Sequence, residues 1–224
     1  MNFVRSIKKN QLGRDFVVGD IHGCFDVLDS ALLDIQFNTA KDRLFSVGDI
    51  IDRGRHSAKC LEYLDKDWFY AVTGNHEQMA IDYMLHGVDE ECYRSNGGQW
   101  LINNTDPFER DRFLSAFASL PIIIEVETDF GMVGIVHAEC PTSNWSALKS
   151  GLINPKTSYH LTQACLWNRK VIYDLCTKPV EDVHAIYCGH TIVGSAQVRG
   201  NHHFIDTGAF KTGRLTIGQI QGQE

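Results

Sequence analysis

Three short segments hold side chains that bind metal ions and transfer protons: "GDIHG" (19–23), "GDIIDRG" (48–54) and "GNHE" (74–77). In the first, Asp20 and His22 are two residues apart on an extended chain. A carboxylate and an imidazole therefore project to the same side and can bind one cation. An ordinary turn capped by an aspartate is the favoured explanation of this motif when it is taken alone. The interpretation depends on the other two segments.

Asp49 has the same position in the second segment as Asp20 has in the first. A carboxylate has two oxygens, so Asp49 can bridge two metal ions about 3.5–4 Å apart, an arrangement that activates water for attack on phosphorus. Asp52 and Arg53 follow in the same segment. An ion pair between them at the surface is the alternative to a chemical role.

Two histidines, His137 in "GIVHAE" and His190 in "IYCGHT", end apolar stretches later in the chain. A single histidine in such a place is more often structural than a ligand. Two of them, with the carboxylates and an amide, supply the mixed oxygen and nitrogen ligands that divalent transition metals favour. The candidate ligands are Asp20, His22, Asp49, Asn75, His137 and His190.

The first half of the chain repeats one plan three times: a short apolar strand, a polar elbow, then an amphipathic helix. Strands that alternate with helices favour parallel pairing, and the carboxyl ends of parallel strands meet at one edge of a sheet. We therefore expect the three elbows to lie together. The expected strands with their elbows are 15–23, 43–54 and 67–77, and the expected helices are 24–37, 57–64 and 78–85.

The second half is rich in expected strands. The stretch of about 86–120, which ends in a helical pattern over 109–120, indicates a cap or insertion, and 122–138 predicts a β-hairpin. Further strands are expected in 185–190, 202–210 and 214–220. The sequence thus predicts an α/β fold, an α/β/β/α sandwich of two mixed sheets flanked by helices. We expect a single catalytic domain over 1–224 with a short irregular arm at 1–14.

The composition limits the partners. A formal charge of −7 and a pI near 5.8 have the wrong sign for a protein that holds nucleic acid non-specifically, and no stretch is long and apolar enough to span a membrane. The seven cysteines are scattered without a C-x-x-C pair, and "MNFVRSIKKNQLG" lacks the apolar core of a signal peptide. We therefore expect a cytoplasmic protein with reduced thiols. The oligomeric state stays open.

The three motifs also resemble a known signature. "GDIHG", "GDIIDRG" and "GNHE", with 29 and 26 residues from Asp20 to Asp49 and from Asp49 to Asn75, are similar to those of the metallophosphoesterase superfamily. The intact "DRG" and "GNHE" resemble its phosphoprotein phosphatase branch. The further motifs "NGGQW", "VHAE", "LWNR" and "GHT" resemble the small bacteriophage lambda-type serine/threonine protein phosphatases and their bacterial relatives.

That resemblance implies a metal-dependent phosphatase that cleaves phosphoserine and phosphothreonine in proteins or peptides by direct attack of hydroxide held by two divalent metal ions. Manganese is expected first, with iron, zinc, nickel or cobalt as alternatives. It implies that one ion is bound by Asp20, His22 and Asp49, and the other by Asp49, Asn75, His137 and His190.

The resemblance also implies roles for four residues that are not ligands. His76 would be the general acid and Asp52 would orient it, while Arg53 and Arg169 would bind the phosphate. The match at Arg169 rests on "LWNR" alone, and an arginine that covers the Trp167 ring is the alternative. Glu77 and Glu139 receive no defined role.

Three other functions compete. A dinucleoside polyphosphate hydrolase of the same superfamily would act on diadenosine tetraphosphate, but its second motif usually lacks the aspartate before the arginine, which is present here as Asp52. A cyclic-nucleotide phosphodiesterase or nuclease is disfavoured by Arg53 and by the acidic charge. A catalytically inactive scaffold is expected to have lost ligands or the acid, whereas every matched position is intact.

Overall fold

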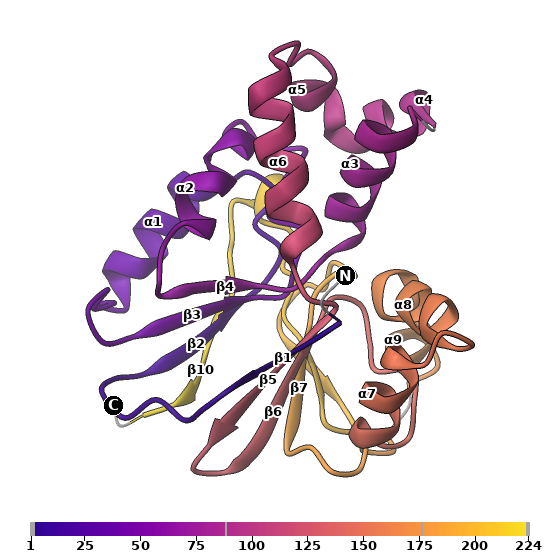
Figure 1. Ribbon diagram of the computed structural model, residues 1–224. Helices are drawn as coiled ribbons and strands as arrows, with labels where there is room; N and C mark the ends of the chain where they lie inside the picture. Colours follow the sequence, from indigo (N-terminus) through magenta and orange to yellow (C-terminus); the bar gives the residue numbers. More distant parts are fainter. Residues whose placement is uncertain (1–2, 88, 176, 223–224) are drawn as a thin grey trace.

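Short apolar strands build two sheets that pack face to face in the computed structural model, which describes residues 3–87, 89–175 and 177–222 (Figure 1). The smaller sheet is mixed: three neighbouring strands are parallel and the fourth, at one edge, is antiparallel. Its order is β10 (Ile217–Gln221), β2 (Asp15–Val18), β3 (Arg43–Ser46) and β4 (Phe69–Ala71). The larger sheet is also mixed, in the order β1 (Val4–Ile7), β5 (Ile123–Thr128), β6 (Gly131–Val136), β7 (Ala185–Cys188), β9 (His202–Phe204) and β8 (Gln197–Arg199).

Side-chain alternation along the strands explains the layers. Phe16 and Val18 of β2 belong to the core beneath one group of helices, whereas Val17 between them belongs to the core between the two sheets. In β5, Ile124 likewise faces the other sheet and Ile123 faces outward, into a third core. The predicted α/β/β/α sandwich is thus confirmed.

Helices cover both outer faces (Figure 1). The smaller sheet is covered by helices of the first half of the chain, and α7, α8 and α9 cover the larger one. The first group comprises α1 (Phe25–Asp34), a 3₁₀ turn (Ser57–Lys59), α2 (Cys60–Leu64), α3 (Asn75–His86) and α6 (Pro107–Ser119). The second comprises α7 (Trp145–Ile153), α8 (Ser158–Trp167) and α9 (Lys170–Tyr173), and a short α10 (Ala209–Thr212) precedes β10.

The stretch 86–120 packs on the helices of the smaller sheet. Between α3 and α6 the chain forms α4 (Glu90–Tyr93), a π-helical turn (Arg94–Gly98) and α5 (Gln99–Ile102). Tyr93 and Leu101 are buried in the same core as Phe16 and Val18. This stretch therefore joins the main core.

Three expectations need correction. The arm 1–14 is not irregular throughout, because Val4–Ile7 forms β1 and pairs in parallel with β5. The third helix begins at Asn75 and not at residue 78. The second half is less dominated by strands than expected, since α7 and α8 lie between β6 and β7. The hairpin of β5 and β6 is confirmed, with Ile123 opposite Val136.

This topology gathers the motifs. The elbows follow β2, β3 and β4, which run in parallel, so all three lie at one edge of the smaller sheet. His137 and His190 follow β6 and β7, which are parallel to each other in the larger sheet. Among the described residues, no helix combines the length and the apolar character needed to cross a bilayer.

Candidate metal centre and active site

The elbows adopt a backbone conformation that ordinary residues avoid. His22, Asp49, Asp52, Arg53 and His190 all have positive φ, between 45° and 69°. Such left-handed residues other than glycine are strained and persist where the surrounding structure holds them, most often at functional sites. The strain therefore coincides with the motifs that the sequence singles out.

Gly189, beside His190, allows the two sheets to approach each other. A Cβ atom at this position would lie 1.8 Å from Asp20 Oδ1, so any other residue would displace that carboxylate. The His190 backbone N–H donates to Asp20 Oδ2 at 3.0 Å. Glycine at 189 thus brings the loop after β7 against the elbow after β2.

Asn75, His137 and His190 form one cluster with Asp49. Asn75 Oδ1 lies 2.8 Å from His137 Nε2 and 2.8 Å from His190 Nδ1, and Asp49 Oδ1 lies 3.4 Å from His137 Nε2. The other ring nitrogens of the two histidines face backbone oxygens, His137 Nδ1 at 2.9 Å from Val47 O and His190 Nε2 at 3.3 Å from Trp167 O. Because those oxygens can only accept, each ring carries its proton there, and lone pairs converge on the cluster. Converging acceptors of this kind suit a cation.

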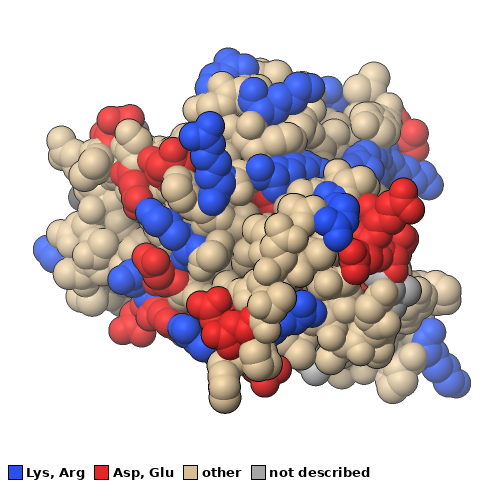
Figure 2. All heavy atoms as spheres, turned by 90° about the horizontal axis from the view of Figure 1, so that it is seen from above, with Lys and Arg blue, Asp and Glu red and all other residues tan. Residues whose placement is uncertain are grey.

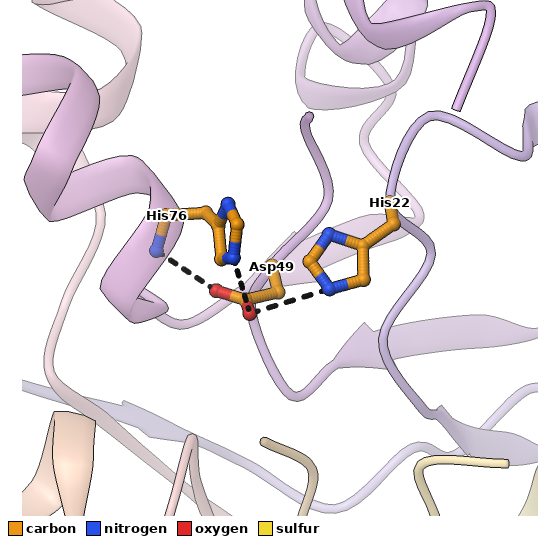
Figure 3. A group of neighbouring side chains, drawn as sticks. All are labelled: His22, Asp49 and His76. Atoms are coloured by element: carbon orange, nitrogen blue, oxygen red, sulfur yellow. Dashed lines mark hydrogen bonds and ion pairs between the residues drawn. The ribbon is translucent and has the colours of Figure 1, made fainter. Parts of the chain in front are cut away.

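A second cluster lies on the other side of Asp49. His22 Nε2 lies 3.5 Å from Asp49 Oδ2 (Figure 3). The same nitrogen lies 4.0 Å from Asp20 Oδ2, and His22 Nδ1 donates to Ile51 O at 2.8 Å. Asp49 Oδ1 faces His137 while its Oδ2 faces His22. One carboxylate therefore lies between both clusters, which is the position of a bridging ligand.

The protonation states of the side chains in the two clusters also fit metal binding. Burial lowers the pKa of His22 and of His190 to about 3 and lowers that of His137. These imidazoles are therefore neutral, the form that binds metals. Burial opposes ionisation of Asp49, but the histidines that face it favour the carboxylate and lower its pKa, and among them His76 is the one whose own pKa is raised. The donor set of neutral nitrogens and carboxylates matches divalent transition metals.

His76 differs from these histidines. Its Nδ1–H donates to Asp52 Oδ2 at 2.7 Å. Its Nε2 lies 3.8 Å from Asp49 Oδ2 (Figure 3). By distance His76 could also join His22 and Asp49 around a metal. Burial lowers its pKa, but the carboxylates of Asp49 and Asp52 outweigh that effect, so the net pKa is raised. The protonated form of His76 is thus favoured, which suits a proton donor.

Asn75 and His76 share the centre because both lie in the first turn of α3. Successive residues of a helix project about 100° apart, so their side chains reach different parts of one site. Asn75 faces His137 and His190, and His76 faces Asp52.

The two arginines lie on different sides of the site. Arg53 Nη1 donates to His22 Nε2 at 3.0 Å, and its guanidinium lies 4.6 Å from the centre of the Phe210 ring. Arg169 is exposed at the start of α9, and its charge helps to lower the pKa of His137 and of His190. Both guanidinium groups are thus near the clusters.

Glu77 and Glu139, to which no role was assigned from the sequence, accept hydrogen bonds from backbone N–H groups. Glu77 is fully buried and accepts from the N–H groups of Gly74, Asp49 and Ile50 at 2.8–2.9 Å, which ties the second elbow to the third. Burial and Asp49 raise the pKa of Glu77 to about 8, whereas its three N–H donors favour the ionised form. Glu139 accepts from the Val171 N–H at 2.7 Å and from Asn168 and Lys170, on either side of Arg169.

Sequence reasoning missed three residues at this site. Asp206 is buried and hydrogen-bonded to the Asp20 carboxyl, and burial raises its pKa to about 6. Tyr93 and Trp100 both donate to Asp52. A signal for Asp206 exists in "FIDTG", where an acidic residue follows an apolar strand as in the other elbows. Trp100 ends the motif "NGGQW", to which no role was assigned from the sequence, and Tyr93 carries no such signal.

Comparison with known proteins agrees with this geometry. Residues 16–194 match the protein family described as calcineurin-like phosphoesterase. The chain is 34% identical over 211 residues to serine/threonine-protein phosphatase 2 of Salmonella typhimurium, covering 92% of each protein. It is 41% identical over 72 residues to a symmetrical bis(5'-nucleosyl)-tetraphosphatase of Actinobacillus pleuropneumoniae, covering 31% of this chain and 27% of that protein. The fold is similar to a cold-active protein-tyrosine phosphatase of a psychrophilic Shewanella, with a TM-score of 0.62 and 19% identity over 97% of this chain and 77% of that one.

Proposed function

Because this chain belongs to the calcineurin-like phosphoesterase family, we propose that it is a metal-dependent protein phosphatase that hydrolyses phosphoserine and phosphothreonine. The observation that carries the proposal is the pairing of two acceptor clusters around Asp49 with a protonatable His76 beside them. Similarity to a serine/threonine-protein phosphatase over 92% of both proteins supports the substrate class.

The metal ligands are proposed as Asp20, His22 and Asp49 for one divalent ion, and Asp49, Asn75, His137 and His190 for the other. When bound, such ions act as Lewis acids toward phosphate oxygens and lower the pKa of water, so that a nucleophile is available near neutral pH. Mixed carboxylate, amide and imidazole donors suit manganese, with iron, zinc, nickel or cobalt as alternatives.

The chain's own residues supply the remaining chemistry. His76 protonates the seryl or threonyl oxygen as the ester bond to phosphorus breaks, since alkoxides are poor leaving groups without a proton. Asp52 holds Nδ1 of His76, so Nε2 is left to face the leaving oxygen. Arg53 and Arg169 bind phosphate oxygens and offset negative charge in the transition state. The bond from the water oxygen to phosphorus forms as the ester bond breaks, and the proton on the leaving oxygen comes from His76.

The net charge supports proteins or peptides as substrates, and the free cysteines support a cytoplasmic location. The net charge is −7, and the face seen in Figure 2 carries acidic and basic side chains together, which disfavours nucleic acid as a non-specific partner. The proposed substrates are phosphorylated proteins or peptides. Six cysteines are free among the described residues, which supports a cytoplasmic location.

The second candidate is a diadenosine tetraphosphate hydrolase. It is favoured by the 41% identity to the bis(5'-nucleosyl)-tetraphosphatase of A. pleuropneumoniae, although that similarity spans only 72 residues. The leading proposal is preferred because Asp52 is present and hydrogen-bonded to His76.

A parallel assay separates these functions. Manganese-supplemented protein is compared on a phosphoserine peptide, a phosphotyrosine peptide, diadenosine tetraphosphate and a phosphodiester, with Asp49→Asn as the control for contaminating phosphatase. We expect the highest kcat/KM on the phosphoserine peptide and little turnover by the control. A preference for diadenosine tetraphosphate would establish the second candidate, and no turnover with bound manganese would favour an inactive scaffold.

A further inference from the structure

The carboxylate of Asp52 has more partners than the orientation of His76 requires. Its Oδ2 accepts from His76 Nδ1–H at 2.7 Å. Its Oδ1 accepts from Trp100 Nε1–H at 2.7 Å and from the Tyr93 hydroxyl at 3.1 Å. Asp52 itself is 0% exposed, so these donors replace water around its charge. Each oxygen of this carboxylate therefore has a separate task.

Both additional donors come from one stretch of the chain, residues 93–100, hereafter the cap segment. Tyr93 ends α4 and Trp100 lies in α5, and the π-helical turn Arg94–Gly98 joins them. The turn is kinked at Gly97, whose backbone is not helical, so it is not a continuous helix. The motif "SNGGQW" lies in this segment, and none of the roles proposed above uses it.

The glycines of the cap segment let it approach the second elbow. Gly97 has a φ of 99°, and a Cβ atom there would lie 2.4 Å from the backbone nitrogen of Arg53. At Gly98 a Cβ atom would lie 2.4 Å from the Tyr93 ring. The segment thus packs directly on the two left-handed residues, Asp52 and Arg53, whose backbone needs external support.

Both donor rings are themselves held in place. The Tyr93 ring packs on Tyr83 of α3 at 5.5 Å, and the Trp100 ring packs edge to face on Phe113 of α6 at 5.0 Å. Fixed rings present their N–H and O–H groups in a fixed direction, which is what orientation of a charged partner requires.

We propose that the cap segment is a positioning element for the general acid: Tyr93 and Trp100 fix the Asp52 carboxylate so that His76 faces the leaving group. This inference rests on the proposed function, because it assumes that His76 protonates the leaving oxygen. Tyr93 and Trp100 are positioning residues, since their polar contacts are to Asp52. A purely structural role, as core aromatics, is the competing explanation, and it predicts equal effects on every substrate.

Conservative variants separate the two explanations. Tyr93→Phe and Trp100→Phe keep an aromatic ring and remove one donor each, and Tyr83→Phe is the matched control because Tyr83 packs on Tyr93 but does not contribute a bond to Asp52. Each variant, and His76→Asn, is assayed with manganese on a phosphoserine peptide and on p-nitrophenyl phosphate. The aryl leaving group departs without a proton, so its turnover does not depend on a general acid.

We expect the Tyr93→Phe, Trp100→Phe double variant to lose about 10- to 100-fold in kcat on the phosphoserine peptide and less than about threefold on p-nitrophenyl phosphate. KM and manganese content should be unchanged, and Tyr83→Phe should resemble the wild type. If the double variant does not fold, Tyr93→Phe alone carries the test.

Equal losses on both substrates, or no loss on either, would overturn the positioning role. The proposed function is tested separately by His76→Asn in the same assay. If that variant shows no selective loss on the phosphoserine peptide, the acid role of His76 is wrong, and the positioning role falls with it whatever the cap variants do.

Discussion

At the scale of residues, one carboxylate organises the site. Asp49 faces His22 with one oxygen and His137 with the other, and its negative charge also favours protonation of His76. Asn75 adds a neutral oxygen to the second cluster. Neutral and charged donors are thus combined so that the centre can accept an anionic phosphate.

The first prediction concerns Asn75. Asn75→Ala removes the oxygen that His137 and His190 share, so manganese affinity should fall at least tenfold at one of two sites. Isothermal titration of the apoprotein measures this, with Gln78→Ala, in the same turn of α3, as the control. Unchanged binding at both sites would remove Asn75 from the ligand set.

Most of this site could be predicted because its residues lie in short motifs at strand ends. The six candidate ligands were proposed from residue types at strand ends together with the family resemblance, and the roles of His76 and Asp52 came from that resemblance. Asp206 follows an apolar strand in "FIDTG" and could have been found by that pattern, whereas the contacts of Tyr93 and Trp100 with Asp52 depend on tertiary packing. A residue whose contact lies 41 or 48 positions away leaves no local pattern.

At the scale of elements, the short helix α9 is attached to the site through one side chain. Glu139, two residues after His137, accepts from the Val171 N–H at 2.7 Å and from Asn168 and Lys170. Arg169 is between these donors. The loop after β6 thereby holds the turn that carries the exposed arginine.

The second prediction follows from this attachment. Glu139→Ala should raise KM for a phosphoserine peptide about three- to tenfold, because Arg169 loses its fixed position, and Glu139→Gln should recover part of the loss. Steady-state kinetics with Arg169→Ala as the reference measure the effect. Wild-type kinetics in Glu139→Ala, or loss of manganese, would contradict it.

The elements themselves could be predicted where strands and helices alternate, and the three elbows of the first half were located correctly. Strand β1 was missed since four residues form a strand here only by pairing with β5, more than a hundred positions away. Helices α7 and α8 were missed because "GLINPKTSYHLTQACLW" interrupts its apolar residues with proline and polar groups.

At the scale of the whole molecule, two sheets each carry part of the centre, and each sheet takes one edge strand, β1 or β10, from the opposite end of the chain. Their shared core, which contains Val17, Phe45, Ile124 and Ile135, fixes how the elbows meet the loops of His137 and His190. Stability and metal binding should therefore be linked, because unfolding separates the ligands.

The third prediction concerns stability and pH away from the metal centre. Burial lowers the pKa of His202 to about 4, so it is neutral in the folded protein, whereas in the unfolded chain it takes up a proton below about pH 6.5. The contribution of His202 to the free energy of unfolding is therefore fully present above pH 6.5. As the pH falls toward 4, this contribution is lost and the free energy of unfolding decreases by about 3 kcal/mol at most. Urea unfolding should show a weaker pH dependence in His202→Gln than in the wild type.

The exposed His160 supplies the control for that measurement, because His160→Gln should retain the wild-type pH dependence between 4 and 6.5. Equal pH dependence in the wild type and His202→Gln would mean that burial of His202 does not contribute to acid sensitivity.

Within "GNHE", Asn75 is proposed as a metal ligand and His76 as the general acid, and one comparison tests this assignment most directly. Manganese content and turnover of a phosphoserine peptide are measured together for the wild type and His76→Asn. We expect two ions per chain in both proteins and a loss of about 10²- to 10⁴-fold in kcat for the variant. Loss of one ion on His76→Asn would contradict this assignment, because His76 would then be a ligand and not the acid.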